Sequence, residues 1–257
     1  MRLKIYLEPY RNEYSIPINY QYLLSSVVYK IFQNGSQSIA KWLHDNGFKD
    51  EKGRSLKLFN FSGLVFEKHK VREDIIHCSG VASFIFSSPV KTNLIKTFVS
   101  GILLNPNFEI VSRNLSVKFY ISNIEILPEP IFEETNYYKS ITPINVSTQR
   151  IENGKRKIEY LNPSDKRYVT QIKNNLLKKF NLIYSDNLDS NIEITINSTQ
   201  NIKSKLITIK EGTMEETKVK GYLHELEIKA PYEIHKIAYY CGIGEKNSLG
   251  FGMIELK

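Results

Sequence analysis

A glycine-rich segment near the C-terminus, GIGEKNSLGFG at Gly242–Gly252, has the composition of a ligand-binding loop. Glycine inside a helix or strand costs roughly 0.5–1 kcal/mol relative to alanine, so a cluster of glycines needs a reason. Glycine permits close approach to the backbone and leaves N–H groups able to face an anion. The segment therefore predicts an anion-binding loop, whose candidate contacts are Gly242, Gly244, Lys246, Gly250 and Gly252. A helix cap at Gly242 followed by a turn would explain only one or two of these glycines.

Two common nucleotide-binding motifs do not fit this segment. A dinucleotide-binding loop follows a strand and opens a helix, whereas here the apolar pattern predicts a helix before the glycines and a strand after them. A P-loop requires Gly-Lys followed by Ser or Thr, which is absent from the segment. The anion is therefore not predicted to be a nucleotide cofactor.

A basic stretch between residues 150 and 179 contains nine Lys or Arg and three Asp or Glu, and so holds most of the net charge of +8. Lys and Arg displace counterions from phosphates, so such a stretch is typical of a protein that binds a polyanion. A solvated helix face is the alternative. The candidate contacts are Arg150, Lys155, Arg156, Lys157, Lys166, Arg167 and Lys173.

The composition limits the class of protein. The chain has 257 residues, of which 41% are hydrophobic and 24% charged, as in ordinary globular domains. No apolar run is long enough to span a bilayer, and the N-terminus lacks the pattern of a signal peptide. Cys78 and Cys241 lie far apart, and no cluster has metal-ligand spacing. We therefore expect a cytoplasmic protein with no metal, no cofactor and no membrane partner.

The apolar spacing of the first half predicts the order β-α-β-β-α-β, which is the ferredoxin-like order. A strand is expected at 2–8, a helix at 20–31 that stops at Gly35, and a short helix at about 38–43. The remaining expected elements are strands at 56–67 and 81–88, a helix at 94–103, and strands at 108–111 and 115–127.

The second half can be interpreted in the same way. Strands are expected at 140–148 and 157–161 around an Asn153-Gly154 turn, then a helix with Ser164 as its N-cap. Further strands are expected at 192–196, 205–210 and 222–229, then a helix from Pro231 to Cys241 and a strand at 253–256. The sequence thus predicts an α+β protein with two tandem ferredoxin-like domains, 1–127 and 131–257, joined at LPEP.

The segment GIGEKNSLGFGMIEL resembles the C-terminal glycine-rich loop of the CRISPR-associated RAMP proteins. It is most similar to that of the endoribonucleases that process CRISPR repeat precursor RNA, the Cas six family. The stretch YLNPSDKRYVTQIKNNLLKKF resembles the first strand–helix junction of their second domain. The resemblance also covers the N-terminal strand, the Tyr-rich first helix and a histidine after it, and so spans nearly the whole chain. Two tandem RRM-like (RAMP) domains are what it implies for the fold.

For function, the resemblance implies a metal-independent endoribonuclease in which the RNA 2′-hydroxyl attacks and leaves a 2′,3′-cyclic phosphate. The family's Tyr, His and Lys match Tyr29, His44 and Lys52 here, with Lys49 and Arg54 as alternatives to the lysine. The partner would be CRISPR repeat precursor RNA, with a CRISPR effector complex as a further partner. The protein would be a monomer or a homodimer.

The residues themselves give partial support. Tyr29 lies about 140° around the expected helix from Leu24, and so off its apolar side. His44 ends a short helix, where carbonyl dipoles favour a protonated imidazole that could act as an acid. An incidental surface role is the alternative for each. His235 is a second candidate for proton transfer near the RNA, while His69 and His77 are expected to face water.

Two other functions stay open. A non-catalytic RAMP subunit would use the glycine loop and the basic helix only to bind RNA. A generic RRM-like binder is disfavoured, because the strand segments LKIYLEP and VASFIFSS lack the aromatic RNP signature.

Overall fold

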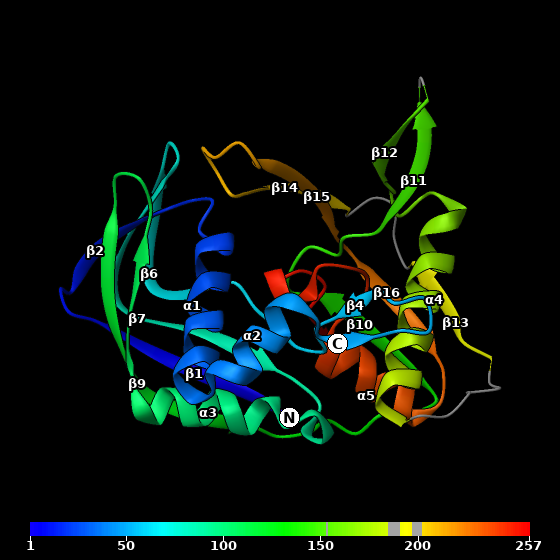
Figure 1. The fold of residues 1–257 in the computed structure, drawn as a ribbon, viewed down its shortest axis with the longest axis horizontal. Helices are drawn as coiled ribbons and strands as arrows, with labels where there is room; N and C mark the ends of the chain where they lie inside the picture. The colour runs from blue at the N-terminus through cyan, green and yellow to red at the C-terminus, as the bar shows by residue number, and fades with distance from the viewer. Residues whose placement is uncertain (153, 185–190, 197–201) are drawn as a thin grey trace. The chain divides into compact units, whose positions relative to one another are not determined.

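The computed structural model describes residues 1–152, 154–184, 191–196 and 202–257 (Figure 1). Contacts divide the chain into two compact units. The first comprises Met1–Lys57 and Phe61–Glu129, and the second comprises Leu58–Asn60 and Pro130–Lys257. Both cysteines are free and buried. Within the described ranges, none of the helices is long and apolar enough to cross a bilayer.

The first unit contains an antiparallel sheet in which β1 pairs with β7 on one side and β9 on the other, while β6 pairs with β7. With the helices α1 and α3, these strands follow the chain order β-α-β-β-α-β, which confirms the ferredoxin-like prediction. The bounds are β1 (Arg2–Pro9), α1 (Gln21–Gly35), β6 (Val65–Arg72), β7 (Ile75–Ser87), α3 (Leu94–Leu104) and β9 (Ser116–Leu127). The added elements are β2 (Glu13–Pro17), α2 (Gln37–Asp45), β3 (Phe48–Lys49), β4 (Ser55–Leu56), β5 (Asn60–Phe61), η1 (Val90–Thr92) and β8 (Asn107–Val111).

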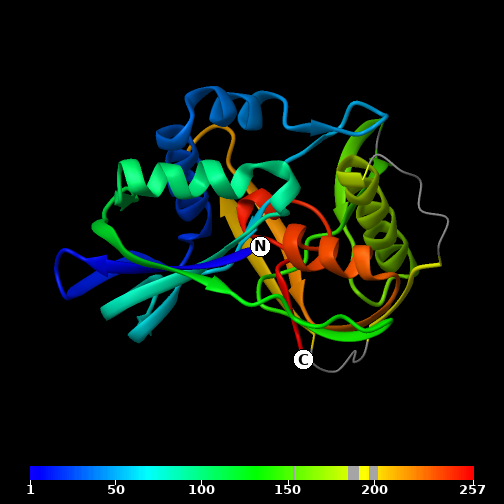
Figure 2. The same cartoon turned by 90° about the horizontal axis from the view of Figure 1, so that it is seen from below.

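Helices α1 and α3 lie on the same side of this sheet (Figure 2) and cross at two glycines. A Cβ on Gly35 would overlap the carbonyl oxygen of Thr97, and one on Gly101 would overlap that of Ile31. The side chains that α1 buries, including Leu24, fall at helical spacing. Gly35 is thus the last residue of α1, and it is needed for the close approach of α3.

The segment expected as one strand at 56–67 is not continuous. It contains the ends of β4 and β6 and the short strand β5. Leu58 interrupts it with a left-handed backbone conformation (φ 49°), which a regular strand cannot include. The strand β2 was not predicted, and it pairs with the early part of β7.

The second unit repeats the same order of strands and helices. Its sheet has the strand order β13-β16-β10-β17, and α4 and α5 pack together on one side of it (Figure 2). The bounds are β10 (Thr135–Ser140), α4 (Lys166–Tyr184), β13 (Glu193–Ile196), β16 (Glu225–Lys229), α5 (Tyr232–Cys241) and β17 (Ile254–Leu256). Two antiparallel hairpins are added, β11 (Ser147–Glu152) with β12 (Lys155–Tyr160) and β14 (Lys203–Ile209) with β15 (Thr217–Leu223), and η2 (Asn247–Leu249) lies in the glycine-rich segment.

Two strand predictions in this unit need correction. The strand expected at 222–229 is broken at His224, whose N–H donates to the hydroxyl of Ser140 (2.8 Å). The strand expected at 140–148 is not continuous, since Ser140 ends β10 and Ser147 begins β11. The buried residues 142–146 between them make only isolated bridges, at Ile144 and Asn145. Asn153 of the expected turn lies outside the described residues.

Candidate active site

His44 lies in the last turn of α2, on an anchored helix that leaves its side chain in solvent. Ser36 caps this helix by accepting the N–H of Ile39 (3.4 Å), and Ala40 and Leu43 are its buried residues. The His44 side chain is 81% exposed. The sequence thus places the imidazole on the open side of an amphipathic helix.

Tyr29 of α1 faces His44. The centroids of the two rings are 6.4 Å apart, and the rings are nearly perpendicular at 81°. Tyr29 is half-buried, while the apolar side of α1, with Val28 and Phe32, is fully buried. The structure therefore brings together two of the side chains that the sequence nominated, through the packing of α2 against α1.

Asp45 is a site residue that the sequence analysis missed. Its carboxylate lies 2.8 Å from Nδ1 of His44, and this hydrogen bond lowers the pKa of Asp45. With the Nδ1 proton directed at Asp45, Nε2 is the nitrogen left for a substrate. A carboxylate directly after a histidine was the available sequence signal.

Lys57 changes the expected electrostatics of His44. Its ammonium donates to the carbonyl oxygens of Leu43 and His44, the latter at 3.0 Å. Burial of this ammonium lowers the pKa of Lys57. The helix-end carbonyls that were expected to favour a protonated His44 are therefore already occupied by a cation, and Asp45 supplies the negative charge beside the imidazole.

The predicted phosphate-binding lysine lies on the β3–β4 ribbon. Arg54, one alternative, is engaged by Asp50 through a guanidinium contact of 2.9 Å. Burial alone would raise the pKa of Asp50, but its hydrogen bonds from Arg54 hold that pKa below the usual value. The ammonium groups of Lys49 and Lys52 have no carboxylate partner in the described part of the chain, and neither bonds Tyr29 or His44. Lys52 stays a prediction, and Arg54 is the least available of the three.

All four glycines of the glycine-rich segment have a backbone conformation that favours glycine. Gly242, Gly244 and Gly252 have φ of 75°, 68° and 73°, in the left-handed region. A Cβ on Gly244 would overlap the carbonyl of Asn145, and one on Gly252 would overlap that of Ile243. Gly250 is also left-handed, with φ 81°. The glycines thus make a tightly folded loop possible, which is a different requirement from close approach by a ligand.

This folded loop still offers unoccupied donors. Among the residues that the structure describes, the backbone N–H groups of Lys246, Asn247 and Ser248 have no hydrogen-bond acceptor. These three residues are half-exposed. Successive N–H groups of this kind, with a lysine side chain beside them, can bind an anion.

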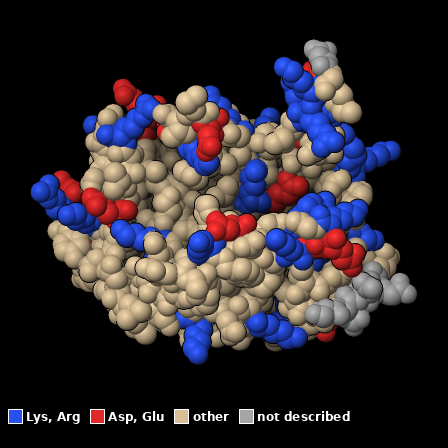
Figure 3. Space-filling model, in the orientation of Figure 1, with Lys and Arg blue, Asp and Glu red and all other residues tan. Residues whose placement is uncertain are grey.

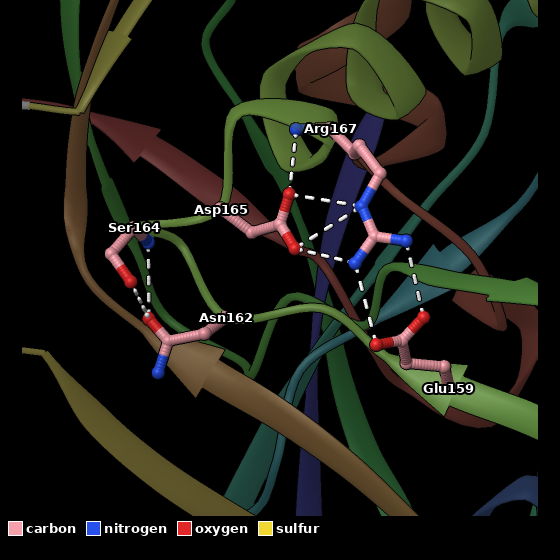
Figure 4. A network of polar contacts seen from close by, with 5 residues as sticks. All are labelled: Glu159, Asn162, Ser164, Asp165 and Arg167. Carbon is pink, nitrogen blue, oxygen red and sulfur yellow. Dashed lines mark hydrogen bonds and ion pairs between the residues drawn. The ribbon is translucent and has the colours of Figure 1, made fainter.

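The basic stretch separates into paired and unpaired cations. Arg167 is held by Asp165 (2.7 Å) and Glu159 (3.1 Å), as Figure 4 shows. The carboxylate of Asp165 also accepts the N–H of Arg167 (2.8 Å), so Asp165 caps α4, whereas the predicted cap Ser164 bonds Asn162 instead. Arg150 and Lys157 share Glu152. Cations without a carboxylate partner in the described residues are Lys155, Arg156, Lys166 and Lys173.

Lys and Arg side chains gather on the β11–β12 hairpin, at the upper right of Figure 3. The candidates Arg150, Lys155, Arg156 and Lys157 all lie on this hairpin, whereas Lys166, Arg167 and Lys173 lie on α4. The structure therefore places the predicted cations on two neighbouring elements of one unit.

His235 and His224 are buried and hydrogen-bonded within the protein. His235 is fully buried, with Nδ1 bonded to the hydroxyl of Tyr138 (2.9 Å) and Nε2 to the carbonyl of Glu134 (3.1 Å). Burial lowers its pKa, so it is a neutral core residue whose ring is not exposed for proton transfer to a bound RNA. His224 is likewise buried against Tyr168.

His69 and His77 lie within strands β6 and β7, and both are exposed, as the sequence predicted. They border a polar groove of about 580 Å³ on β2, β6 and β7, which is also lined by Lys68, Lys70 and Arg72. His77 is bonded to the hydroxyl of Ser15 (2.9 Å). None of the residues nominated from the sequence for catalysis or RNA binding lines this groove.

Comparison with protein families gives two matches that together span most of the chain. The family described as CRISPR associated protein Cas6, C-terminal, matches residues 127–256, and that described as CRISPR-associated protein Cas6, N-terminal, matches residues 15–125. A similar protein from Methanocaldococcus jannaschii, the CRISPR-associated endoribonuclease Cas6 1, is 29% identical over 99% of this chain and 92% of its own length.

Solved structures of similar proteins also match the whole of this chain. A Cas6-related protein of Pyrococcus furiosus superposes with a TM-score of 0.83 and 25% identity, covering 100% of this chain and 98% of that one. A structure described as CRISPR associated protein Cas6 superposes with a TM-score of 0.79 and 29% identity, covering 100% and 99% of the two chains.

Proposed function

This chain belongs to the Cas6 family, and from this premise we propose that it is a metal-independent endoribonuclease that cuts CRISPR repeat RNA into guide RNAs. The relatives with this name match over 99% and 100% of this chain and over 92% and 90% of their own lengths. The observation that carries the proposal is the arrangement of Tyr29 on α1 with His44 and Asp45 at the end of α2. A protein that only binds RNA would need no such group.

The reaction needs no external nucleophile. The 2′-oxygen of a ribose attacks the adjacent phosphorus and releases its proton to water, while the bond from phosphorus to the 5′-oxygen breaks and that oxygen gains a proton. The products are a 2′,3′-cyclic phosphate and a 5′-hydroxyl. Catalysis then depends on in-line placement, proton transfer and stabilisation of charge on the phosphate.

We assign these roles to the residues of the first unit. Nε2 of His44 gives a proton to the leaving 5′-oxygen, while Asp45 holds the other side of the ring and fixes its orientation. The hydroxyl of Tyr29 contacts the attacking 2′-oxygen. Lys52, with Lys49 as the alternative, holds the phosphate oxygens as a point charge. The glycine loop and the unpaired cations of the second unit bind the rest of the repeat.

The test compares two RNA substrates, the native repeat and the same repeat with a single deoxynucleotide at the cut position. Each is incubated with and without EDTA. We expect cleavage of the native RNA under both conditions, none of the deoxy RNA, and binding of both. The upstream product should carry a cyclic phosphate or the 3′-phosphate derived from it.

Other outcomes would contradict the proposal in distinguishable ways. A hydrolytic metal nuclease would cut the deoxy RNA and stop in EDTA. A non-catalytic RAMP subunit would bind both RNAs and cut neither. Cleavage of the deoxy RNA at the same position would refute the roles given to Tyr29, His44 and Lys52.

A further inference from the structure

Lys179 is a buried lysine beneath the glycine-rich loop, and no role has been assigned to it so far. It lies in α4, and only 2% of its surface is exposed. Its ammonium donates to the carbonyl of Gly242 (2.7 Å), the carbonyl of Gly244 (3.3 Å) and the side-chain oxygen of Asn247 (2.7 Å). Three oxygens thus converge on one cation.

Asn247 extends this arrangement to the other arm of the loop. While its oxygen accepts from Lys179, its amide nitrogen donates to the carbonyls of Ile243 (3.1 Å) and Phe251 (2.9 Å). Lys179 and Asn247 therefore connect the start, the middle and the end of the loop. The unoccupied N–H groups of Lys246, Asn247 and Ser248 lie in the stretch that this connection fixes.

Lys179 forms no ion pair within the described residues. All three of its hydrogen-bond acceptors are uncharged. The ionisable groups that face it are Cys241 of α5 and Glu245 of the loop. Burial raises the pKa of Cys241 to about 12, so it is a neutral thiol. The charge of Glu245 favours the charged form of Lys179, but its carboxylate accepts from the hydroxyl of Ser147 (2.6 Å) and makes no ion pair with Lys179. A buried cation without an ionic partner is unfavourable unless another charge balances it.

We propose that Lys179 is a positioning residue that holds the glycine-rich loop in its binding shape, and that its positive charge is balanced by a phosphate of the bound RNA. The second part rests on the proposed function, whereas the first concerns the free protein. The loop donors and the buried ammonium act on the same anion, the donors by contact and the ammonium through the loop.

This inference predicts a proton linkage. Burial lowers the pKa of Lys179 to about 8, below the usual 10.5. A phosphate at the loop would favour the charged form and raise that pKa in the complex. RNA binding should therefore take up a proton above about pH 8, and affinity should be constant below that pH and fall above it.

The test measures the affinity of the deoxy repeat RNA between pH 7 and 9, and calorimetry in two buffers of different ionisation heat measures proton uptake. Lys179→Met keeps a similar length but removes the charge, and Lys178→Met removes one charge from the neighbouring position of α4. We expect wild-type affinity to fall several-fold between pH 8 and 9, with proton uptake. Lys178→Met should keep this pH dependence, whereas Lys179→Met should bind roughly tenfold more weakly and without proton uptake.

Hydrogen exchange in the free protein tests the positioning part without RNA. In Lys179→Met we expect faster exchange of the bonded loop amides Ile243 and Gly252, but not of the amides in β10. Wild-type exchange rates in Lys179→Met would overturn the positioning role.

Wild-type affinity that does not change with pH, without proton uptake, would overturn the phosphate linkage, even if Lys179→Met failed to fold. Failure of the wild-type protein to bind repeat RNA would overturn both the linkage and the proposed function, but would leave the exchange result decisive for positioning.

Discussion

His44 combines an exposed ring with a fixed orientation, which is what proton transfer to a bound substrate requires. The ring is hydrogen-bonded to Asp45 and faces Tyr29. We predict that His44→Ala slows cleavage by 10²–10⁴, the usual range for loss of a general acid or base. Affinity for the repeat should change by no more than a few-fold, because the predicted binding residues lie elsewhere. Single-turnover cleavage and equilibrium binding measure the two effects, and wild-type cleavage by the variant would remove His44 from the mechanism.

Lys57 stabilises the end of α2, which carries His44, by donating hydrogen bonds to its backbone carbonyls. Replacement by Met would leave the carbonyls of Leu43 and His44 without their donor. We expect Lys57→Met to lower the free energy of unfolding by about 1–3 kcal/mol, the range for hydrogen bonds to a charged group or a buried unsatisfied acceptor. Cleavage should also fall, because the loose helix end carries His44.

The matched control is Lys41→Met on the same helix, where the lysine is exposed. Its effect on unfolding should lie within about 0.5 kcal/mol. Urea unfolding of both variants makes the comparison, and equal values would mean that the Lys57 contacts contribute nothing to the stability of α2.

At the scale of elements, the glycine-rich loop can adopt its conformation only because its glycines carry no side chains. Gly244 and Gly154 have similar left-handed φ angles, 68° and 72°. Alanine in that region costs roughly 1–2 kcal/mol in either case. Only at Gly244 would the new Cβ meet backbone, the carbonyl of Asn145, while at Gly154 it would meet nothing within 4 Å.

We therefore predict that Gly244→Ala is more destabilising than Gly154→Ala by at least about 1 kcal/mol, the lower end of the range for overpacking. Both glycines lie in the second unit, so urea unfolding followed by circular dichroism compares like with like. RNA affinity should fall in Gly244→Ala, because the loop donors move. Equal destabilisation would show that the loop can yield at Asn145.

Helices were easier to predict than strand ends, for a physical reason. The apolar spacing of α1, α3 and α5 is local and repeats every turn, so it can be recognised in the sequence. The breaks at Leu58 and His224 depend on one backbone angle and on one hydroxyl, Ser140, which lies far away in the sequence. Such contacts leave no periodic pattern.

The same distinction applies to the sites. Tyr29 could be nominated because its helical angle takes it off the apolar side, and the structure places it against His44. The roles of Lys57 and Lys179 could not be predicted. Lys57 binds carbonyls 13 and 14 residues away, and Lys179 binds carbonyls 63 and 65 residues away. A lysine that donates to backbone oxygens has no sequence signature, because every residue offers such an oxygen.

At the scale of the whole molecule, the nine Lys and Arg residues of the basic stretch overstate the number of cations that are free to meet RNA. Arg167 already has two carboxylate partners, and Arg150 and Lys157 share one. A cation that is neutralised within the protein releases fewer counterions from the RNA. The slope of log affinity against log salt should therefore depend on the number of unpaired cations and not on the total number of Lys and Arg residues.

This argument gives a comparison of two variants. Lys155 has no carboxylate partner in the described residues, whereas Arg167 is held by Asp165 and Glu159. If Lys155 contacts one phosphate of single-stranded RNA, Lys155→Ala should reduce the slope of log affinity against log salt by about 0.7. Arg167→Ala should change that slope much less, because Arg167 brings little net charge to the complex. Titrations of the deoxy repeat at several salt concentrations measure both slopes. An equal reduction in the two variants would mean that RNA displaces Asp165 and Glu159 from Arg167, and that the ion pairs of the free protein do not select the cations that bind.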